Sequence, residues 1–389
     1  MEKNRQITAT LTSEKGLEQA LTEAGVKDPA TVIKLIVTGP LTEADTEFIR
    51  ENMGKSLQQL DMSGASFTDN ALPRYAFGEC SALATVKIPD TVTIIYAGAF
   101  CRCTGLTSIS IPDSVIEIGG GIFNQCTGLK SITIPYSLTT IHSTSFPCSM
   151  EVSPDHPVFA TENGVLFNRD KTVLIEYPHL RQGDYAIPDS VVKIGKEAFS
   201  YCTGLTSVVI PGSVVEIAED AFDQCENLTS ISIPESVKLI GSFAFYDTGL
   251  TSVTIPDSIT KIDATSFSCP IEVSPDHPVF TAENGILFNK DKTILHRYPR
   301  LRKGDYNIPG SVVEIGESAF ERCDHLTAVT IPDSVVVIGK KAFGSCHHLK
   351  SVKIPASVRI IEKNAFLDCE ADILVHPDNP FNFITKDFF

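Results

Sequence analysis

The chain has 389 residues, of which 42% are hydrophobic, enough to bury a large core. Its 48 acidic and 32 basic residues give a formal net charge of -16 and form no basic run, so the electrostatic footprint of a nucleic-acid or anionic-lipid partner is missing. No apolar run approaches the roughly 20 residues of a membrane-spanning helix. We therefore expect no nucleic-acid partner and no transmembrane segment.

The first 56 residues do not repeat, and they predict a small α/β cap at 1–56. Apolar residues at helical spacing over 17–24 predict a helix with its N-cap at Ser13 and its end at Gly25. The β-branched run 31–37 predicts a strand, and Thr42 opens a second short helix. A solenoid needs such a cap because its first rung would otherwise expose an apolar face and an unpaired strand edge.

From Leu57 a repeat takes over, opened by the L-x-x-L-x-L pattern of LQQLDM. Phenylalanines recur at intervals of 23 residues, with one interval of 22, in three series: Phe77, Phe100, Phe123 and Phe146; Phe199, Phe222, Phe245 and Phe267; and Phe320, Phe343 and Phe366. Ile-Pro pairs recur with the same spacing as the phenylalanines. We therefore expect a leucine-rich-repeat solenoid at 57–376, a curved right-handed coil of α/β rungs, with a C-terminal tail at 377–389.

One repeat unit can be interpreted residue by residue. In Leu106–Cys126, alternation predicts a strand with Ile109 inward and with Ser108 and Ser110 outward, ended by a proline that cannot donate to the ladder. A second extended piece is expected before Gly119. Apolar residues at helix-like spacing around Phe123 then predict a short helical turn. A single rung could not bury these groups, so stacking must stabilise the unit.

Two longer variant units, at about 147–187 and 268–308, interrupt the phenylalanine series. They are copies of one another at an offset of 121 residues, and EVSPDHPVF occurs in both without change. In the first copy, apolar runs flank Asn168-Arg-Asp-Lys, which predicts a hairpin. The variant units could bend the solenoid or offer a protruding loop, and we favour the structural role.

The eleven cysteines follow the repeat. Eight lie three residues after a repeated phenylalanine: Cys80, Cys103, Cys126, Cys202, Cys225, Cys323, Cys346 and Cys369. Free cysteine behaves as a small buried hydrophobe, so we expect a column of thiols inside the solenoid. Disulfides between neighbouring rungs are a minor alternative. No CxxC pair occurs, and we expect no metal site.

The unit IPDSVVKIGKEAFSYCTGLTSVVIP from Ile187, and its counterpart from Ile331, resemble the BspA-like, or Treponema-type, leucine-rich repeat. The resemblance covers about residues 57–376. It implies a surface or secreted protein of a host-associated bacterium that adheres to host matrix proteins or to other cells. Two features depart from that pattern: no apolar signal-peptide core follows Met1, and no sorting motif occurs in 382–389.

Catalytic chemistry is not indicated. The sequence lacks the nucleophile-elbow, phosphate-loop, dinucleotide and HExxH motifs. His156 and His277 lie in the duplicated DHP loops, where a metal or acid–base site is conceivable but duplication is the simpler explanation. We expect a protein that is not an enzyme, with no catalytic residues and no cofactor.

The candidate binding site is the outward row of the strand ladder. Its members are Lys87, Ser108, Ser110, Ser131, Thr133, Ser230, Ser232, Ser252, Thr254, Thr330, Ser351 and Lys353. Solenoids commonly bind ligands along this kind of face, so the row could bind a protein or a glycan, for example a host matrix protein. Alternatively, Ser and Thr are simply undemanding strand residues that duplication propagated. We expect a monomer, and a structural or co-assembly component remains the second hypothesis.

Overall fold

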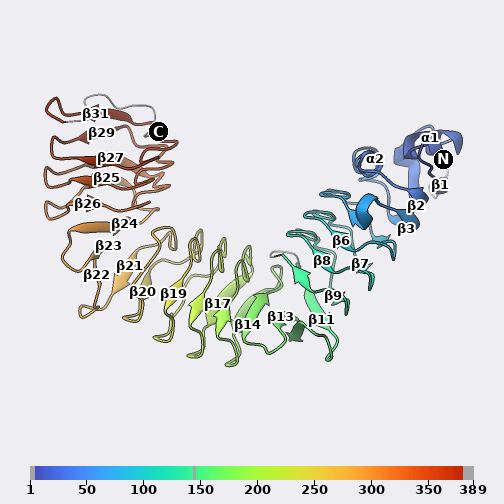
Figure 1. Cartoon of the computed structure of the whole chain (residues 1–389), viewed down its shortest axis with the longest axis horizontal. Helices are drawn as coiled ribbons and strands as arrows, with labels where there is room; N and C mark the ends of the chain where they lie inside the picture. Colours follow the sequence, from blue (N-terminus) through green and yellow to red (C-terminus); the bar gives the residue numbers. More distant parts are fainter. Residues whose placement is uncertain (1–4, 143–145, 380–389) are drawn as a thin grey trace. The chain divides into compact units, whose positions relative to one another are not determined.

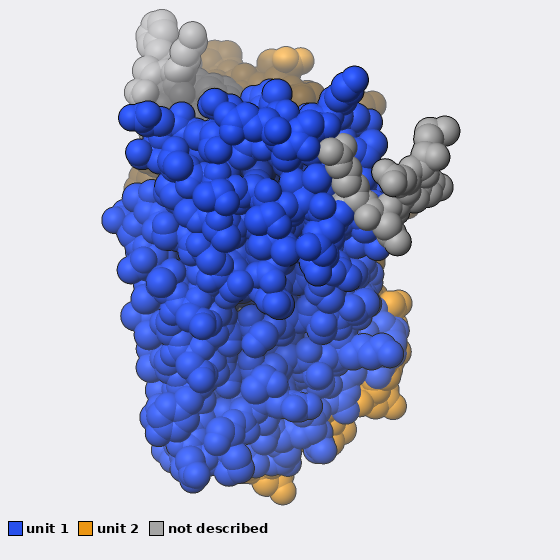
Figure 2. Space-filling model, turned by 90° about the vertical axis from the view of Figure 1, so that its right-hand side faces the viewer, with its two compact units in different colours: residues 1–182, 195–204 blue, residues 183–194, 205–389 orange. Residues whose placement is uncertain are grey.

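The structure is a computed structural model that describes residues 5–142 and 146–379. It contains two compact units, residues 1–182 with 195–204 and residues 183–194 with 205–389 (Figure 2). Both units are stacks of short rungs, and most ordinary rungs have a strand of a first ladder, a two-residue strand of a second ladder and a side made of turns (Figure 1). The predicted solenoid is confirmed.

The cap lies at the N-terminal end of unit 1. Strands β1 (Arg5–Thr10), β2 (Val32–Pro40) and β3 (Gln59–Ser66) pair in parallel, and β3 continues into the first ladder. Two short 3₁₀ helices, Pro29–Thr31 and Thr68–Asn70, precede β2 and follow β3. No sequence pattern predicts β1, and β2 continues to Pro40, beyond the predicted strand at 31–37.

Helices α1 (Leu17–Glu23) and α2 (Glu43–Met53) complete the cap. Thr42 caps α2 in a capping box with Asp45, as its position predicts. The expected N-cap at Ser13 is wrong, because α1 begins after Gly16. The buried Asp45 explains this start, since its Oδ1 accepts a 2.7 Å hydrogen bond from the Leu17 amide and would lie 2.9 Å from a Cβ added to Gly16.

Unit 1 carries both ladders and the first variant unit. The first ladder continues with β5 (Thr85–Lys87), β7 (Ser108–Ser110), β9 (Ser131–Ile134) and β11 (Ser149–Val152). The second ladder contains β4 (Ala71–Leu72), β6 (Ile94–Ile95), β8 (Glu117–Ile118) and β10 (Thr140–Ile141), all parallel. The variant unit adds the antiparallel strands β12 (Phe159–Glu162), β13 (Val165–Asn168) and β14 (Val173–Glu176), which confirms the predicted hairpin.

Unit 2 repeats the scheme. Its first ladder contains β15 (Gly183–Ala186), β17 (Leu205–Val209), β20 (Val253–Ile255), β21 (Ile271–Val273), β25 (Gly304–Asn307), β27 (Leu326–Thr330), β29 (Ser351–Ile354) and β31 (Asp372–Val375). Its second ladder contains β16 (Lys193–Ile194), β18 (Glu216–Ile217), β19 (Leu239–Ile240), β26 (Glu314–Ile315), β28 (Val337–Ile338) and β30 (Ile360–Ile361). The variant strands are β22 (Phe280–Glu283), β23 (Ile286–Asn289) and β24 (Ile294–Arg297).

The third side of each rung is not the helical turn that the spacing predicts. In the rung of Phe123, Gly121 and Gln125 have φ of 66° and 59°. A left-handed residue on each side of the phenylalanine breaks any helix. Some backbone amides close turns within the rung, and others bond to the neighbouring rung, as in the 2.9 Å bond from the Phe100 amide to the Ile122 carbonyl.

Stacked aromatic rings fill the core. In unit 1 the centroids of Phe77, Phe100, Phe123 and Phe146 follow one another at 5.6, 5.8 and 6.1 Å. Tyrosine takes this place in the variant units: Tyr177 lies 5.0 Å from Phe199, and Tyr298 lies 5.0 Å from Phe320. The column therefore includes each variant unit, although the phenylalanine series skips it.

The thiols lie beside the aromatic column. All eleven cysteines are free; nine are buried, while Cys101 and Cys369 are half-buried. The thiol of Cys103 donates to the Phe77 carbonyl at 3.0 Å, and that of Cys126 donates to the Phe100 carbonyl at the same distance. Burial raises the pKa of Cys80 to about 12, so this thiol is a poor nucleophile. The predicted thiol column is confirmed.

Candidate functional site

The predicted binding row lies on the outward side of the first ladder. All of its members are exposed except Ser351, which is half-buried. In unit 1, Lys87 pairs in register with Ser110, and Thr133 pairs with Glu151 of the variant unit. The alternation that the sequence predicts therefore places these side chains on one side of each strand, as expected.

The structure brings the row together in two groups, one in each unit. Unit 1 holds Lys87, Ser108, Ser110, Ser131 and Thr133, and unit 2 holds Ser230, Ser232, Ser252, Thr254, Thr330, Ser351 and Lys353. In unit 2, Thr254 pairs with Glu272 and Thr330 pairs with Lys353. An isolated bridge between Val208 and Ile231 places Ser230 and Ser232 on the same ladder.

Two lysines, Lys87 and Lys353, interrupt the hydroxyl row. The Lys87 ammonium lies 2.9 Å from the Asp61 carboxylate, whose pKa is lowered to about 2. Burial acts to raise that pKa, but hydrogen bonds from Ser63 and Lys87 outweigh it. The row is therefore more varied than its serines and threonines suggest.

A hollow of about 620 Å³ opens on this face in unit 2. Thr330, Ser351 and Lys353 of the predicted row line it together with Leu374, whose side chain is 51% exposed. It combines a cation, hydroxyls and an exposed apolar group, which is the mixture that a binding pocket usually presents. This hollow includes three residues of the predicted site.

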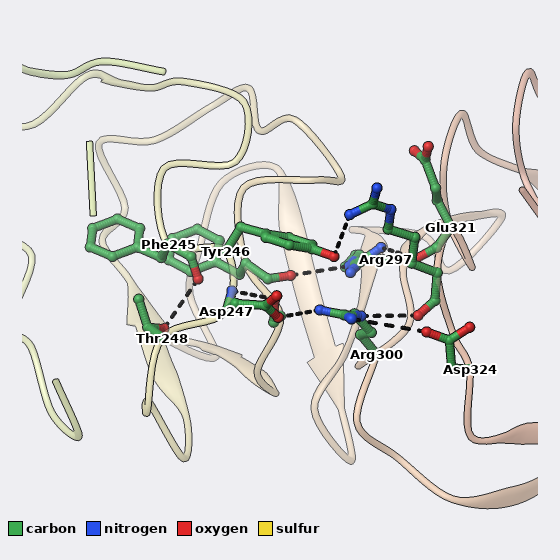
Figure 3. A network of polar contacts seen from close by, with 11 residues as sticks. Phe245, Tyr246, Asp247, Thr248, Arg297, Arg300, Glu321 and Asp324 are labelled. Atoms are coloured by element: carbon green, nitrogen blue, oxygen red, sulfur yellow. Dashed lines mark hydrogen bonds and ion pairs between the residues drawn. The ribbon is translucent and has the colours of Figure 1, made fainter. Parts of the chain in front are cut away.

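A second cluster, which no local sequence pattern predicts, braces the second variant unit. Figure 3 shows Arg300 pointing between Asp247 and Asp324, with the Tyr246 ring above it. The Arg300 guanidinium forms an ion pair with Asp247, lies 3.9 Å from Asp324 and lies 4.8 Å from the Tyr246 ring centroid. Arg322 donates a 2.7 Å hydrogen bond to the Tyr246 hydroxyl, which raises the pKa of Arg322.

Arg297 lies at the centre of this cluster, and its side chain is almost fully buried. It donates to the carbonyls of Phe267 and Ser318, each at 3.3 Å, and burial lowers its pKa. Backbone carbonyls, and not a carboxylate, therefore accept hydrogen bonds from the Arg297 guanidinium. These tyrosine and arginine side chains join four successive rungs, those of Phe245, Phe267, Tyr298 and Phe320, so the arrangement is a brace. The pairs Arg300–Asp247 and Tyr246–Arg322 are 53 and 76 residues apart, too far for local spacing to reveal.

The DHP loops are also structural. His156 and His277 are fully buried. In the first loop, Nδ1 of His156 accepts from the amides of Val158 and Phe159 at 3.2 and 3.1 Å, and Nε2 lies 3.1 Å from the Pro135 carbonyl. His277 makes the same contacts in the second loop. Both imidazoles fasten a loop to the preceding rung.

Comparison with known proteins identifies the repeat. A model of the BspA type leucine rich repeat region matches in six copies, over residues 70–153, 183–273 and 304–389. The chain belongs to the BspA-type leucine-rich-repeat family. The resemblance carried by the IPDSV units is thereby confirmed. A BspA-type array is a protein-interaction scaffold.

Solved structures of other leucine-rich repeat proteins are similar to this BspA-type chain. One from Eubacterium ventriosum is 23% identical, with 90% of this chain and 92% of that chain covered and a TM-score of 0.49. One from Bacteroides ovatus is 24% identical, with 82% and 79% covered and a TM-score of 0.36. A leucine rich cell surface protein from Faecalibacterium prausnitzii is 24% identical, with 81% and 75% covered and a TM-score of 0.34. No curated protein matches the chain.

Two further findings concern the described residues, 5–142 and 146–379. Neither α1 nor any other helix there is long and apolar enough to cross a bilayer. Nowhere in those ranges do three or more His, Cys, Asp or Glu side chains gather closely enough to hold a metal ion. The segment 382–389, in which no sorting motif is expected, lies outside the described residues.

Proposed function

We propose that this BspA-type chain is a non-enzymatic binding protein, located at the cell surface or secreted, that adheres to host proteins or to other cells. The observation that supports this most is the outward row of the first ladder, which is exposed at every position but Ser351 and lies in register between paired neighbouring strands. An exposed row of hydroxyls with interspersed charges offers hydrogen bonds to an extended protein or glycan without large rearrangement.

The strand-ladder face favours a polar ligand of the kind that a host matrix glycoprotein presents. Thr133 and Thr254 each lie in register with an outward glutamate, Glu151 and Glu272, that the variant units supply. Each variant unit thus adds an acceptor to a row that is otherwise made of hydroxyls. The surface location rests on what the family resemblance implies.

The first test is direct binding. The full chain at micromolar concentration should bind saturably to at least one of immobilised fibronectin, laminin and type IV collagen, as measured by surface plasmon resonance. Saturable binding that survives physiological salt supports adhesion, because weak electrostatic contacts between exposed charges are screened there. Absence of binding to all three matrix proteins and to host cells would contradict the proposal.

A second candidate function is that of a structural component that co-assembles through the second ladder. Val192 and Val215 of unit 2, which neighbour each other through a 2.8 Å backbone hydrogen bond, are 43% and 42% exposed, and Leu239 is 48% exposed. A row of exposed apolar side chains can mark an interaction surface. A strictly monomeric chain in analytical ultracentrifugation, with no partner captured from its own cell surface, would exclude this role.

A further inference from the structure

A hollow of about 630 Å³ opens on the turn side of unit 1, away from the first ladder. It extends along the rungs of Phe77, Phe100 and Phe123, and Arg50 of helix α2 borders it. Small-molecule sites typically have volumes of about 300–1,000 Å³, so this hollow is of a size for a small ligand. None of the residues of the strand-ladder face contributes to it.

The hollow exists because glycines, which have no side chain, occupy positions that line it. Gly98 and Gly121 hold the left-handed position two residues before the column phenylalanine. Other rungs fill that position with side chains: Glu197, Asp220, Phe243, Ser318, Lys341 and Asn364. A Cβ added to Gly121 would meet nothing closer than the Cβ of Asn124 at 3.9 Å. In these two rungs the space is therefore open, whereas a side chain occupies the equivalent position in the other rungs named above.

Tyr75 forms an aromatic platform in the hollow. Its ring lies against Gly98, where an added Cβ would be 2.4 Å from a ring carbon. The same side chain is 54% exposed, so part of the ring remains open to a ligand. Tyrosine combines a large apolar area with few rotatable bonds, which makes it a good contact surface. Glycine under the ring is required, because no other residue leaves room for it.

Charge-balanced polar groups surround the platform. Arg102 pairs with Glu79 at 2.9 Å, and Arg50 pairs with Glu47 at 3.1 Å while it donates to the Tyr75 carbonyl at 3.2 Å. Asn124 and Gln125 add amide side chains to the lining. The lining thus offers donors and acceptors side by side without a large net charge. This combination suits a neutral polyhydroxy compound better than an anion or a cation.

We propose that this hollow binds the pyranose ring of a neutral saccharide. One face of the sugar would pack on the Tyr75 ring, and its hydroxyls would exchange hydrogen bonds with Arg102, Glu79 and Gln125. This glycan site stands apart from the proposed adhesion through the strand-ladder face, because the two share no residues.

The test uses the full chain and the methyl glycosides of glucose, galactose, mannose and N-acetylglucosamine, observed by saturation-transfer-difference NMR. At least one neutral glycoside should receive saturation at its ring protons, and glucuronic acid should receive less. Gly121→Asn fills the hollow with a residue that the same position already holds in Asn364, where φ is 60°. It should weaken binding at least tenfold. Asn364→Gly, the reverse change in unit 2, should leave binding unchanged.

A second variant, Tyr75→Asn, tests saccharide binding if Gly121→Asn does not fold. Tyr75→Asn removes the ring, and asparagine tolerates the φ of 53° at that position. It should abolish saturation transfer while the far-UV circular dichroism is retained. The proposal is overturned if the unmodified chain binds none of the four neutral glycosides, if it prefers glucuronic acid, or if a folded Tyr75→Asn variant binds as well as the parent. None of these results bears on matrix-protein binding.

Discussion

Tyr298 occupies the place in the aromatic column of unit 2 that phenylalanine holds in the ordinary rungs. Its ring is fully buried between Phe320 and Tyr306, at centroid distances of 5.0 and 4.9 Å. Its hydroxyl has no hydrogen-bond partner among the described residues, and burial raises its pKa. A buried hydroxyl without a partner costs stability, because it has left water without compensation.

We therefore expect Tyr298→Phe to raise the free energy of unfolding by up to about 1 kcal/mol, since it removes the unpaired hydroxyl and keeps the ring. Urea denaturation followed by circular dichroism measures this. The control is Tyr136→Phe, at a side chain that is 57% exposed, which should change stability by less than about 0.5 kcal/mol. A loss of more than about 1 kcal/mol for Tyr298→Phe would show that the hydroxyl has a stabilising partner.

His179 of the first variant unit is the counterpart of Arg300, 121 residues earlier, and its side chain is 5% exposed. Burial lowers its pKa to about 4. An unfolded histidine titrates near 6.5. The unfolded chain therefore binds more protons between these two values, so stability is complete above pH 6.5 and falls as the pH is lowered towards 4.

The expected loss from this group is about 3 kcal/mol between pH 7 and pH 4, on the scale of 1.36 kcal/mol per pKa unit. His179→Leu should flatten that part of the stability profile, whereas His142→Gln, at an exposed histidine, should not. Urea midpoints measured from pH 7 to pH 4 provide the comparison. An unchanged slope in His179→Leu would mean that His179 is already protonated in the folded chain.

At the residue level the sequence predicts periodic features well. The alternation in Leu106–Cys126 places Ser108 and Ser110 outward, as the structure shows, and half-buries Ile109. It could not reveal that Asp45 caps the start of α1 from 28 residues away, because the contact forms only in the folded cap. Nor could it show Tyr75 lying over Gly98, which depends on rung stacking.

The two copies of the variant unit differ in the charges of their buried side chains. At equivalent places the first copy has Glu176 and His179, and the second has Arg297 and Arg300. All four side chains lie mostly inside the protein. In the second copy, Arg300 and Asp247 connect the variant unit to the rung of Phe245. This brace supports a structural role for the second variant unit.

The brace predicts strong coupling between Arg300 and Asp247. A double-mutant cycle with Arg300→Met and Asp247→Asn should give an interaction energy of about 1 kcal/mol or more, because Arg300 is only 17% exposed. Asparagine suits the φ of 48° at Asp247, so the single variant adds no backbone strain. The same cycle on Lys340 and Glu317, an exposed pair at 3.0 Å, should give less than about 0.5 kcal/mol. Equal coupling for the two pairs would contradict the bracing role.

Secondary structure is predicted correctly where local sequence determines it, and incorrectly where the stacking of rungs or strands determines it. The hairpin around Asn168 follows from turn chemistry, and its amide bonds to Thr172 and to the Val173 backbone. The helical turn around Phe123 is wrong because the carbonyls of Ile122 and Asn124 accept from the amides of Phe100 and Arg102 in the neighbouring rung. Strand β1 was missed because its short polar sequence becomes a strand only by pairing with β2.

For the whole chain, the repeat period alone predicts the solenoid, and the family match confirms it. The division into a cap at 1–56, an array at 57–376 and a tail at 377–389 stays a prediction. Within each unit, the core positions are fixed by packing, while the outward positions of the first ladder are free of that requirement. Function should therefore depend on the outward positions, and their substitution should change binding without changing the fold.

The most direct test of this account compares two triple variants of the full chain for binding to the matrix protein that the unmodified chain binds best. The first variant carries Thr133→Arg, Thr254→Arg and Thr330→Arg, all exposed on the first ladder. The control carries Thr140→Arg, Ser190→Arg and Thr260→Arg, equally exposed but away from that ladder. Both variants add the same charge.

The first-ladder variant should lose at least tenfold in affinity by surface plasmon resonance, and the control should stay within about twofold of the parent. Both variants should unfold at the parent's urea midpoint, since exposed positions contribute little to stability. Equal binding by the two variants, or a loss confined to the control, would contradict the claim that the first ladder is the binding face.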